Sequence, residues 1–390
     1  MGYKFVITEE QGYIMTALFD GDRCDDLLLS VNSAENAPVI GDIWIGHVKR
    51  VLPNIHAAFV DIMPGVTGYL PLNGHDDIKA EQDIPVQIVK EAVKSKDMML
   101  TADFSISGRF CAMTIGKRGV GISKKINDTE LREKLLERAR NILSPSADEP
   151  YVGTVIRTNA VEADDDAFLR DLLNTKEEMD RILLASKHRT VYSRLYHAPD
   201  PEISLIRDMH APIEKIVTDI PEEAEKIRGF FADTEKITSV LSLYEDESLA
   251  LRKLYRLDSL LDEVFKKTVW LPSGGSIVLE VTEALTVIDV NTGKTDKKRT
   301  KEENFLQTNI EAAREAARQI RLRNYSGMIL IDFINMREKS NLKELEKELT
   351  KDLSRDRITC RFMDFTKLGL AEITREKTSR PLHEIIRKKG

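Results

Sequence analysis

Two aspartates stand where apolar, β-branched stretches of the sequence end. Asp289 lies near the end of the stretch 285–290, and Asn291 lies two positions after it. Asp332 ends a second apolar stretch that begins at Met328. Because side chains alternate along a strand, Asp289 and Asn291 should point to the same face. If the two strands are neighbours, both carboxylates meet at one edge of a sheet.

Two adjacent carboxylates repel each other, and a divalent cation is the simplest neutraliser. This spacing is therefore compatible with a site for Mg²⁺. The alternative is an ordinary ion pair, in which a carboxylate is neutralised by Lys294 or a nearby arginine. The residue spacing by itself leaves both interpretations open.

The elements that would position these residues lie between 276 and 336. The stretches 277–281 and 285–290 predict a β-hairpin, and the spacing of Phe305, Ala312, Ala313, Ala316 and Ile320 predicts a helix over 302–323. Asn309 falls within this apolar stripe, where it either orients a ligand group from behind or binds a neighbouring backbone. Arg314, Arg318 and Arg321 fall on the opposite side, which is expected to face solvent.

Short strands with Gly and Pro punctuation over 38–102 predict a small barrel. Phe59 and Tyr69 occupy strand positions in it, and Lys49, Arg50 and Lys96 supply positive charge. Exposed aromatics beside cations form a platform on which the bases of single-stranded nucleic acid stack. The alternative is that both rings belong to the barrel core.

A third group of residues could bind phosphate. Residues 119–125 read Gly-Val-Gly-Ile-Ser-Lys-Lys, and a strand predicted over 151–158 ends in Arg157 and Thr158. A glycine-containing loop with Ser123 and Lys124 facing this pair could hold one phosphate through charge-assisted hydrogen bonds.

Composition limits the class of protein. The chain has 390 residues, 42% hydrophobic and 32% charged, with a net charge of −7. These values exclude a collagen-like or wholly disordered chain and predict two to four domains. No uncharged apolar run is long enough for a membrane helix, and the acidic N-terminal start does not resemble a signal peptide, so we expect a cytoplasmic protein. The three cysteines are dispersed, without a zinc-ligand spacing.

Outside these regions, strands are expected at 3–8, 14–19 and 24–29, and helices at 128–143 and 164–187. Residues 200–268 are charged, with prolines at 201, 212 and 221, and are expected to be mostly helical.

In this order, the segments resemble the catalytic half of the ribonuclease E/G family over residues 3–382. The most specific stretches are Leu-Pro-Ser-Gly-Gly-Ser at 271–276, Thr-Glu-Ala-Leu-Thr-Val-Ile-Asp-Val-Asn-Thr-Gly-Lys at 282–294, the helix 307–323, Ile-Leu-Ile-Asp-Phe-Ile-Asn at 329–335 and Leu-Gly-Leu-Ala-Glu-Ile-Thr-Arg at 368–375.

The resemblance implies an α+β multidomain protein. A ribonuclease-H-like fold (1–35 and 199–264) would carry an inserted OB-type S1 RNA-binding barrel (36–102) and a five-prime-sensor domain (103–198). A DNase-I-like catalytic domain (265–382) and a basic tail (383–390) would follow.

The resemblance also implies roles for the candidate residues. Asp289 and Asp332 would hold a catalytic Mg²⁺, for which Mn²⁺ could substitute, and Asn291 would assist. Phe59, Tyr69 and Lys96 would line the RNA path. A five-prime monophosphate would be gripped by Lys124, Arg157, Thr158 and Arg375.

The implied activity is endonucleolytic cleavage of single-stranded RNA, with a preference for five-prime-monophosphate ends. The products would carry five-prime phosphate and three-prime hydroxyl groups, and the substrates would be rRNA precursors and mRNA, in rRNA maturation and RNA turnover. The competing class is a non-catalytic RNA-binding regulator that uses the barrel alone. A metal-dependent phosphatase is disfavoured because it would not need the barrel.

Two departures from the family pattern affect these expectations. Asn335 stands where relatives often have a second acid, which lowers the local negative charge. The zinc-sharing Cys-Pro-x-Cys segment expected after residue 382 is missing, so we expect no structural zinc and a monomer or weak homodimer.

Overall fold

The computed structural model describes residues 2–31, 37–92, 97–143, 152–293 and 300–386. The chain divides into two compact units. Unit 1 comprises Met1–Asn32, Ile213–Gly229 and Ile237–Gly390, and unit 2 comprises Ser33–Pro212 and Phe230–Lys236. No helix among the described residues is long and apolar enough to cross a membrane.

The first sheet of unit 1 combines the N-terminus with a much later segment. Its strand order is β15-β14-β1-β2-β3, with β1 (Tyr3–Glu10), β2 (Tyr13–Asp20), β3 (Arg23–Val31), β14 (Ile213–Thr218) and β15 (Leu241–Leu243). The three N-terminal strands are confirmed, and β1 pairs with β14 in parallel. Nearly the whole of unit 2 is thus inserted between two paired strands.

The expectation that 200–268 is mostly helical was incomplete. Its helices are α3 (Pro201–Asp208), α4 (Pro221–Phe230), α5 (Glu235–Thr238), α6 (Leu251–Leu254) and α7 (Leu257–Val264). The segment also supplies β14 and β15, which the sequence reading missed. Strand β14 is short and contains the exposed charged residues Glu214 and Lys215. Its three buried positions therefore do not form a recognisable alternating pattern in the sequence.

Unit 2 contains the expected barrel. Five strands follow the order β4-β5-β6-β8-β7, and β7 closes the ring by pairing with β4. They are β4 (Ile43–Leu52), β5 (Ala57–Met63), β6 (Val66–Pro71), β7 (Asp83–Lys90) and β8 (Met98–Thr101), with a 3₁₀ turn at Pro53–Ile55. The interior is apolar and includes Val48, Val60, Leu70 and Leu100. Closure removes the unpaired strand edges that such a small sheet would otherwise expose.

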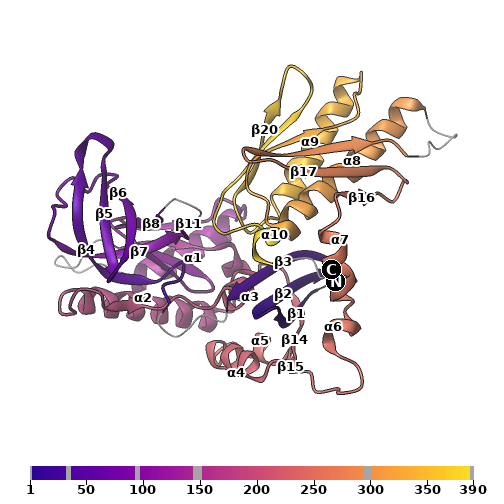
Figure 1. Cartoon of the computed structure of the whole chain (residues 1–390). Coiled ribbons are helices and arrows are strands. Elements are labelled where there is room, and N and C mark those ends of the chain that lie inside the picture. Colours follow the sequence, from indigo (N-terminus) through magenta and orange to yellow (C-terminus); the bar gives the residue numbers. More distant parts are fainter. Residues whose placement is uncertain (1, 32–36, 93–96, 144–151, 294–299, 387–390) are drawn as a thin grey trace. The chain divides into compact units, whose positions relative to one another are not determined.

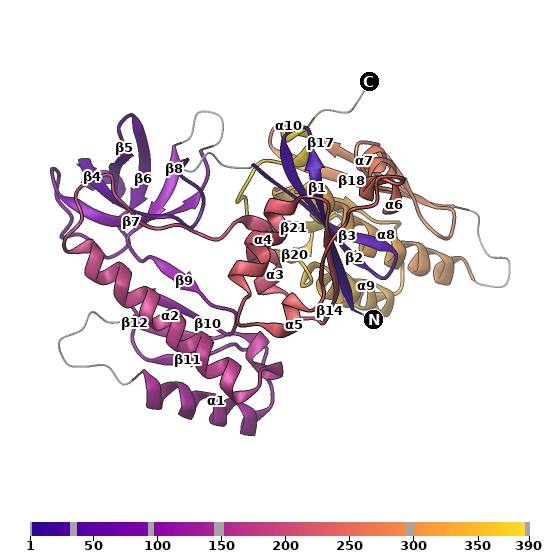
Figure 2. The same ribbon diagram turned by 90° about the horizontal axis from the view of Figure 1, so that it is seen from below.

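Unit 2 also contains a four-stranded sheet, and Figure 2 shows two helices, α1 and α2, beside this sheet. Its elements are β9 (Ser105–Ser107), β10 (Cys111–Ile115), β11 (Val120–Ile122), β12 (Val152–Ile156), α1 (Thr129–Ile142), α2 (Asp165–Ser186), a 3₁₀ turn at Thr158–Glu162, and β13 (Arg194–Tyr196), which pairs with β4. Both helices begin as expected, because the carboxylates of Asp128 and Asp164 cap the backbone of the first turn.

The second sheet of unit 1 carries the candidate metal site. Its order is β16-β17-β18-β19-β21-β20, with β16 (Thr268–Trp270), β17 (Ser276–Val281), β18 (Leu285–Asn291), β19 (Gly327–Asp332), β20 (Cys360–Phe365) and β21 (Ala371–Arg375). Helices α8 (Lys301–Arg323) and α9 (Lys339–Leu353) pack on one face, as Figure 1 shows. A short helix, α10 (Leu382–Ile385), follows. Alternate side chains of the strands therefore point away from these helices.

Helix α8 is covered on two sides, which corrects one expectation. Its predicted apolar stripe packs into the core of the sheet. Arg314 faces solvent, but Arg318 and Arg321 are 8% and 3% exposed. Arg318 donates to the carbonyl of Cys24 in β3 at 2.7 Å, and Arg321 pairs with Asp25 at 2.6 Å. The arginine face is thus an internal contact of unit 1.

Candidate functional site

The structure brings the two predicted carboxylates side by side. Strands β18 and β19 are parallel neighbours, and Asp289 pairs in register with Asp332 at their carboxyl ends. Helix α8 makes the connection between them. Ile288 and Ile331 point into the core, so alternation directs both aspartates to the opposite, exposed face. Neighbouring strands lie about 4.8 Å apart, which places the two carboxylates within reach of one ion.

The local contacts of this pair fit a cation. The amide nitrogen of Asn291 donates to a carboxylate oxygen of Asp289 at 2.9 Å. Within the described ranges, neither aspartate forms an ion pair with a lysine or arginine. Lys294, the alternative partner, lies outside those ranges. Two adjacent anions, one of them oriented by an amide, form an oxygen-donor set that suits Mg²⁺ or Mn²⁺.

Asn309 stabilises the backbone next to the carboxylate pair. It is fully buried in α8; its amide nitrogen donates to the carbonyl of Ile334 at 2.8 Å, and its amide oxygen accepts from the Ile334 backbone at 2.9 Å. The sequence left open whether Asn309 orients a ligand group or binds a backbone. It binds the backbone of Ile334, two residues after Asp332, and so fixes the backbone segment that follows Asp332.

A close contact between two glycine-containing segments was missed by sequence reasoning. A Cβ on Gly275 would lie 2.8 Å from the carbonyl oxygen of Asn291, and one on Gly293 would lie 2.2 Å from the backbone of Gly274. Only glycine permits this approach, which holds the backbone that follows β18 against the turn before β17. The Gly-Gly pair in that turn is the sequence feature that could have indicated this close contact.

The predicted aromatics of the barrel lie outside its core. Phe59 and Tyr69 pair across β5 and β6, with ring centroids 5.9 Å apart in an edge-to-face arrangement. The guanidinium of Arg50 lies 4.5 Å from the Phe59 ring centroid. Neither ring belongs to the buried cluster of the barrel, and both are half-buried. Lys96 lies outside the described residues.

The predicted phosphate-binding residues meet at the ends of β11 and β12. Ser123 donates its backbone N–H to Ile156, and its hydroxyl lies 3.0 Å from that of Thr158. Lys124 follows Ser123 and is exposed. Arg157 donates through Nη1 to the carbonyl of Gly108 at 2.9 Å and to Asp208 at 2.7 Å.

The partner of Arg157 is a charged carboxylate. Burial tends to raise the pKa of Asp208, but hydrogen bonds from Arg207 and Arg157 outweigh it and hold the pKa below its usual range. The side chain of Arg157 is 19% exposed. One edge of its guanidinium is thus anchored, while Nε and Nη2 make no hydrogen bond to a described residue.

Arg375, the fourth residue predicted to bind the phosphate, has different surroundings. It belongs to unit 1, whereas Lys124, Arg157 and Thr158 belong to unit 2. Its side chain is fully buried, donating to both oxygens of Asp356 at 2.7 and 3.1 Å, to Asn324 at 2.7 Å and to the carbonyl of Tyr325 at 3.0 Å. Four of its five N–H groups are therefore occupied. These contacts give Arg375 a structural role in unit 1, and its part in phosphate binding stays a prediction.

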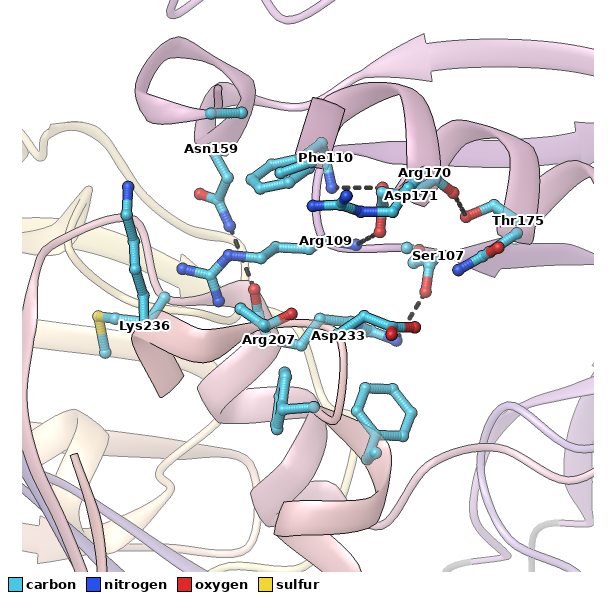
Figure 3. A pocket seen from close by; sticks show the side chains of 18 of the residues that line it. Ser107, Arg109, Phe110, Asn159, Arg170, Asp171, Thr175, Arg207, Asp233 and Lys236 are labelled. Carbon is cyan, nitrogen blue, oxygen red and sulfur yellow. Dashed lines mark hydrogen bonds between the residues drawn. The ribbon is translucent and has the colours of Figure 1, made fainter. Parts of the chain in front are cut away.

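Unit 2 also contains a cavity of about 690 Å³. Figure 3 shows the Arg109 side chain reaching into it between Asn159 and Arg207. Burial lowers the pKa of Arg109, and its Nη1 has no hydrogen-bond partner among the described residues. The acidic lining residues outnumber the basic ones, so the cavity is not a simple anion site; the acids are Glu162, Asp164, Asp171, Glu178, Asp233 and Glu235, and the bases are Arg109, Arg170, Arg207 and Lys236.

Comparison with known proteins supports one family. The family model described as "Ribonuclease E/G family" matches residues 105–378. Ribonuclease E of Synechocystis sp. is 32% identical over 99% of this chain and 58% of its own length. Ribonuclease E of Escherichia coli (strain K12) is 30% identical over 96% of this chain and 37% of its own. Ribonuclease G of Salmonella typhimurium is 29% identical over 89% of this chain and 75% of its own.

The chain thus spans less than three fifths of the length of the Synechocystis relative, but that relative matches almost all of the chain. The family model covers the four-stranded sheet of unit 2, the carboxylate pair and the helix between the two aspartates. From the in-register carboxylates and these matches, we conclude that the chain belongs to the ribonuclease E/G family.

Proposed function

We propose that this protein is a divalent-metal-dependent endoribonuclease that cleaves single-stranded RNA. The observation that carries the proposal is the in-register pair Asp289 and Asp332, with Asn291 bonded to Asp289. An RNA-binding regulator has no need of two adjacent, exposed carboxylates. The names of the relatives, ribonuclease E and ribonuclease G, support the same activity.

The carboxylates of Asp289 and Asp332 would hold Mg²⁺, with Mn²⁺ as a substitute. The ion, when bound, supplies an activated water and stabilises negative charge on the scissile phosphate. Asn291 orients Asp289 through its amide hydrogen bond. Asn309 fixes the backbone after Asp332. We expect cleavage to leave five-prime phosphate and three-prime hydroxyl ends.

The domain identities belong to this proposal. The closed five-stranded barrel is consistent with an OB-type S1 domain. We interpret the strands of the first sheet as the ribonuclease-H-like part and the sheet that carries the carboxylates as the DNase-I-like part. Action on rRNA precursors and mRNA, in rRNA processing and RNA turnover, would follow from this assignment.

One experiment tests the activity. Purified protein is incubated with an end-labelled single-stranded RNA in Mg²⁺, in Mn²⁺ and in chelator, with the fully paired duplex as the matched substrate. Internal cleavage of the single strand in either metal, and none in chelator, is the expected result. Binding without cleavage in any metal would favour the regulator. Metal-independent cleavage would contradict the carboxylate site.

For the barrel, we propose that Phe59, Tyr69 and Lys96 line the RNA path, with Arg50 against Phe59. Phe59→Ala should weaken RNA binding by roughly 1–3 kcal/mol, because stacking of bases on an aromatic ring has this magnitude. The melting temperature should change little, since Phe59 lies outside the barrel core. A binding titration and a thermal melt measure both quantities. A core role would instead lower the free energy of unfolding by about 3–5 kcal/mol.

We also propose that Lys124, Arg157 and Thr158 bind a five-prime monophosphate. Nη1 of Arg157 is anchored, whereas Nε and Nη2 make no hydrogen bond to a described residue and are available to a phosphate. Arg157→Ala should slow cleavage of monophosphate-ended RNA about tenfold or more, because a charge-assisted hydrogen bond contributes about 1.5–3 kcal/mol. Cleavage of hydroxyl-ended RNA of the same sequence should be nearly unchanged. Equal slowing of both substrates would assign Arg157 to the fold or to the general RNA path.

A further inference from the structure

Trp270 is a large aromatic side chain left in solvent. It is 74% exposed, although it lies in a regular strand, β16. Its neighbour Val269 packs against the core of the sheet. Alternation therefore directs Trp270 to the face away from α8 and α9, which is the face of the two carboxylates.

The strand register places Trp270 close to the candidate active site. Trp270 pairs with Ser276, and Ser276 pairs with Asn291, so the three residues form one row across β16, β17 and β18. The next row contains Thr268, Val278, Asp289 and Asp332. Two interstrand spacings and one step of two residues amount to about 12 Å between the backbones of Trp270 and Asp289.

One residue separates Trp270 from Asn291 in this row. The residue in the intervening strand is Ser276, which is small and 7% exposed. The backbone after Trp270 is held in a turn, because the N–H of Leu271 donates to the carbonyl of Gly275 at 2.8 Å, and Gly275 packs on the carbonyl of Asn291. The indole thus projects from a backbone position that is fixed relative to the carboxylates.

We propose that Trp270 stacks on a base of the RNA strand whose scissile phosphate lies at Asp289 and Asp332, and so positions that phosphate. The inference rests on the proposed endoribonuclease function. A planar indole accepts the π-face of any base, which suits a single strand with unstacked bases and excludes a paired duplex. A base stacked on the indole would also remove apolar surface of Trp270 from water.

The direct test is the fluorescence of Trp270. The chain has two tryptophans, and the other, Trp44, is 5% exposed in the barrel. The emission of Trp270 is the difference between otherwise identical proteins with Trp270 and with Trp270→Phe. The measurement is made in the Asp289→Asn background, in which we expect RNA to stay intact. Single-stranded RNA should quench this difference signal, and an abasic strand with the same phosphates should not.

Kinetics provide the second readout. Trp270→Ala should raise KM for single-stranded RNA about 5- to 150-fold, the range that stacking of one base predicts. Trp270→Phe should restore most of the loss, because its ring can still stack. The melting temperature should be unchanged in both variants, since the side chain is exposed.

Several outcomes would overturn the proposal. One is RNA binding without quenching, and another is equal quenching by the abasic strand. A shift of Trp270 emission on raising protein concentration without RNA would indicate a second copy of the chain as the occupant. If the wild type does not cleave RNA, the endoribonuclease proposal fails, and the quenching measurement still decides whether a base stacks on Trp270.

Discussion

Asp289→Asn and Asp332→Asn should each lower the rate of RNA cleavage by about a thousandfold or more. Each change keeps the size of the side chain but removes one of the two charges that meet at the ends of β18 and β19. A metal ion contributes several kcal/mol to such a reaction, and each 1.36 kcal/mol corresponds to a factor of ten in rate. RNA binding should persist, because neither residue is in unit 2, which contains the barrel.

The measurement is single-turnover cleavage across a range of Mg²⁺ concentrations, beside an RNA-binding titration. Glu280→Gln is a matched control, since it removes an exposed charge from neighbouring strand β17. It should leave the cleavage rate near that of the wild type. Asn291→Ala should have an intermediate effect of about 10- to 100-fold, as expected for a residue that orients a metal ligand. Full activity in either aspartate variant would contradict the two-carboxylate site.

Arg375→Ala should lower the free energy of unfolding by about 3–5 kcal/mol, because it breaks a buried ion pair by removing one partner. The side chains of Arg375 and Asp356 are 0% and 2% exposed. Without the guanidinium, the carboxylate of Asp356 stays buried without its counter-charge, and the Asn324 amide oxygen and the Tyr325 carbonyl lose a donor. Chemical denaturation measures the loss.

Two further variants separate this structural role from phosphate binding. Arg375→Met combined with Asp356→Asn removes both charges and should recover part of the lost stability. Under conditions where Arg375→Ala is folded, the ratio of cleavage rates for monophosphate-ended and hydroxyl-ended RNA should equal that of the wild type. A normal stability with a lost monophosphate preference would show that Arg375 serves the phosphate after all.

Much of the local structure could be predicted from the sequence, because its signals depend on near neighbours. Alternation and helical spacing predicted the hairpin β17–β18 and helix α8. Acidic N-cap residues marked the starts of α1 and α2. The same local rules identified Asp289, Asn291 and Asp332 as strand-end residues, and the order of the motifs pointed to the family that the comparisons support.

The spatial arrangement was decided by tertiary structure alone. Asp289 and Asp332 are separated by more than forty positions, and only the parallel register of β18 and β19 makes them neighbours. The same limit explains why Arg318 and Arg321 were expected to face solvent although they are buried. Periodicity tells which side of α8 carries Arg318, but not that β3, from the N-terminus, covers that side. Likewise, no local pattern predicts that Asp356 and Asn324 converge on Arg375. Pairing and burial depend on contacts between distant segments. The free energy of these contacts cannot be read from any short stretch of sequence.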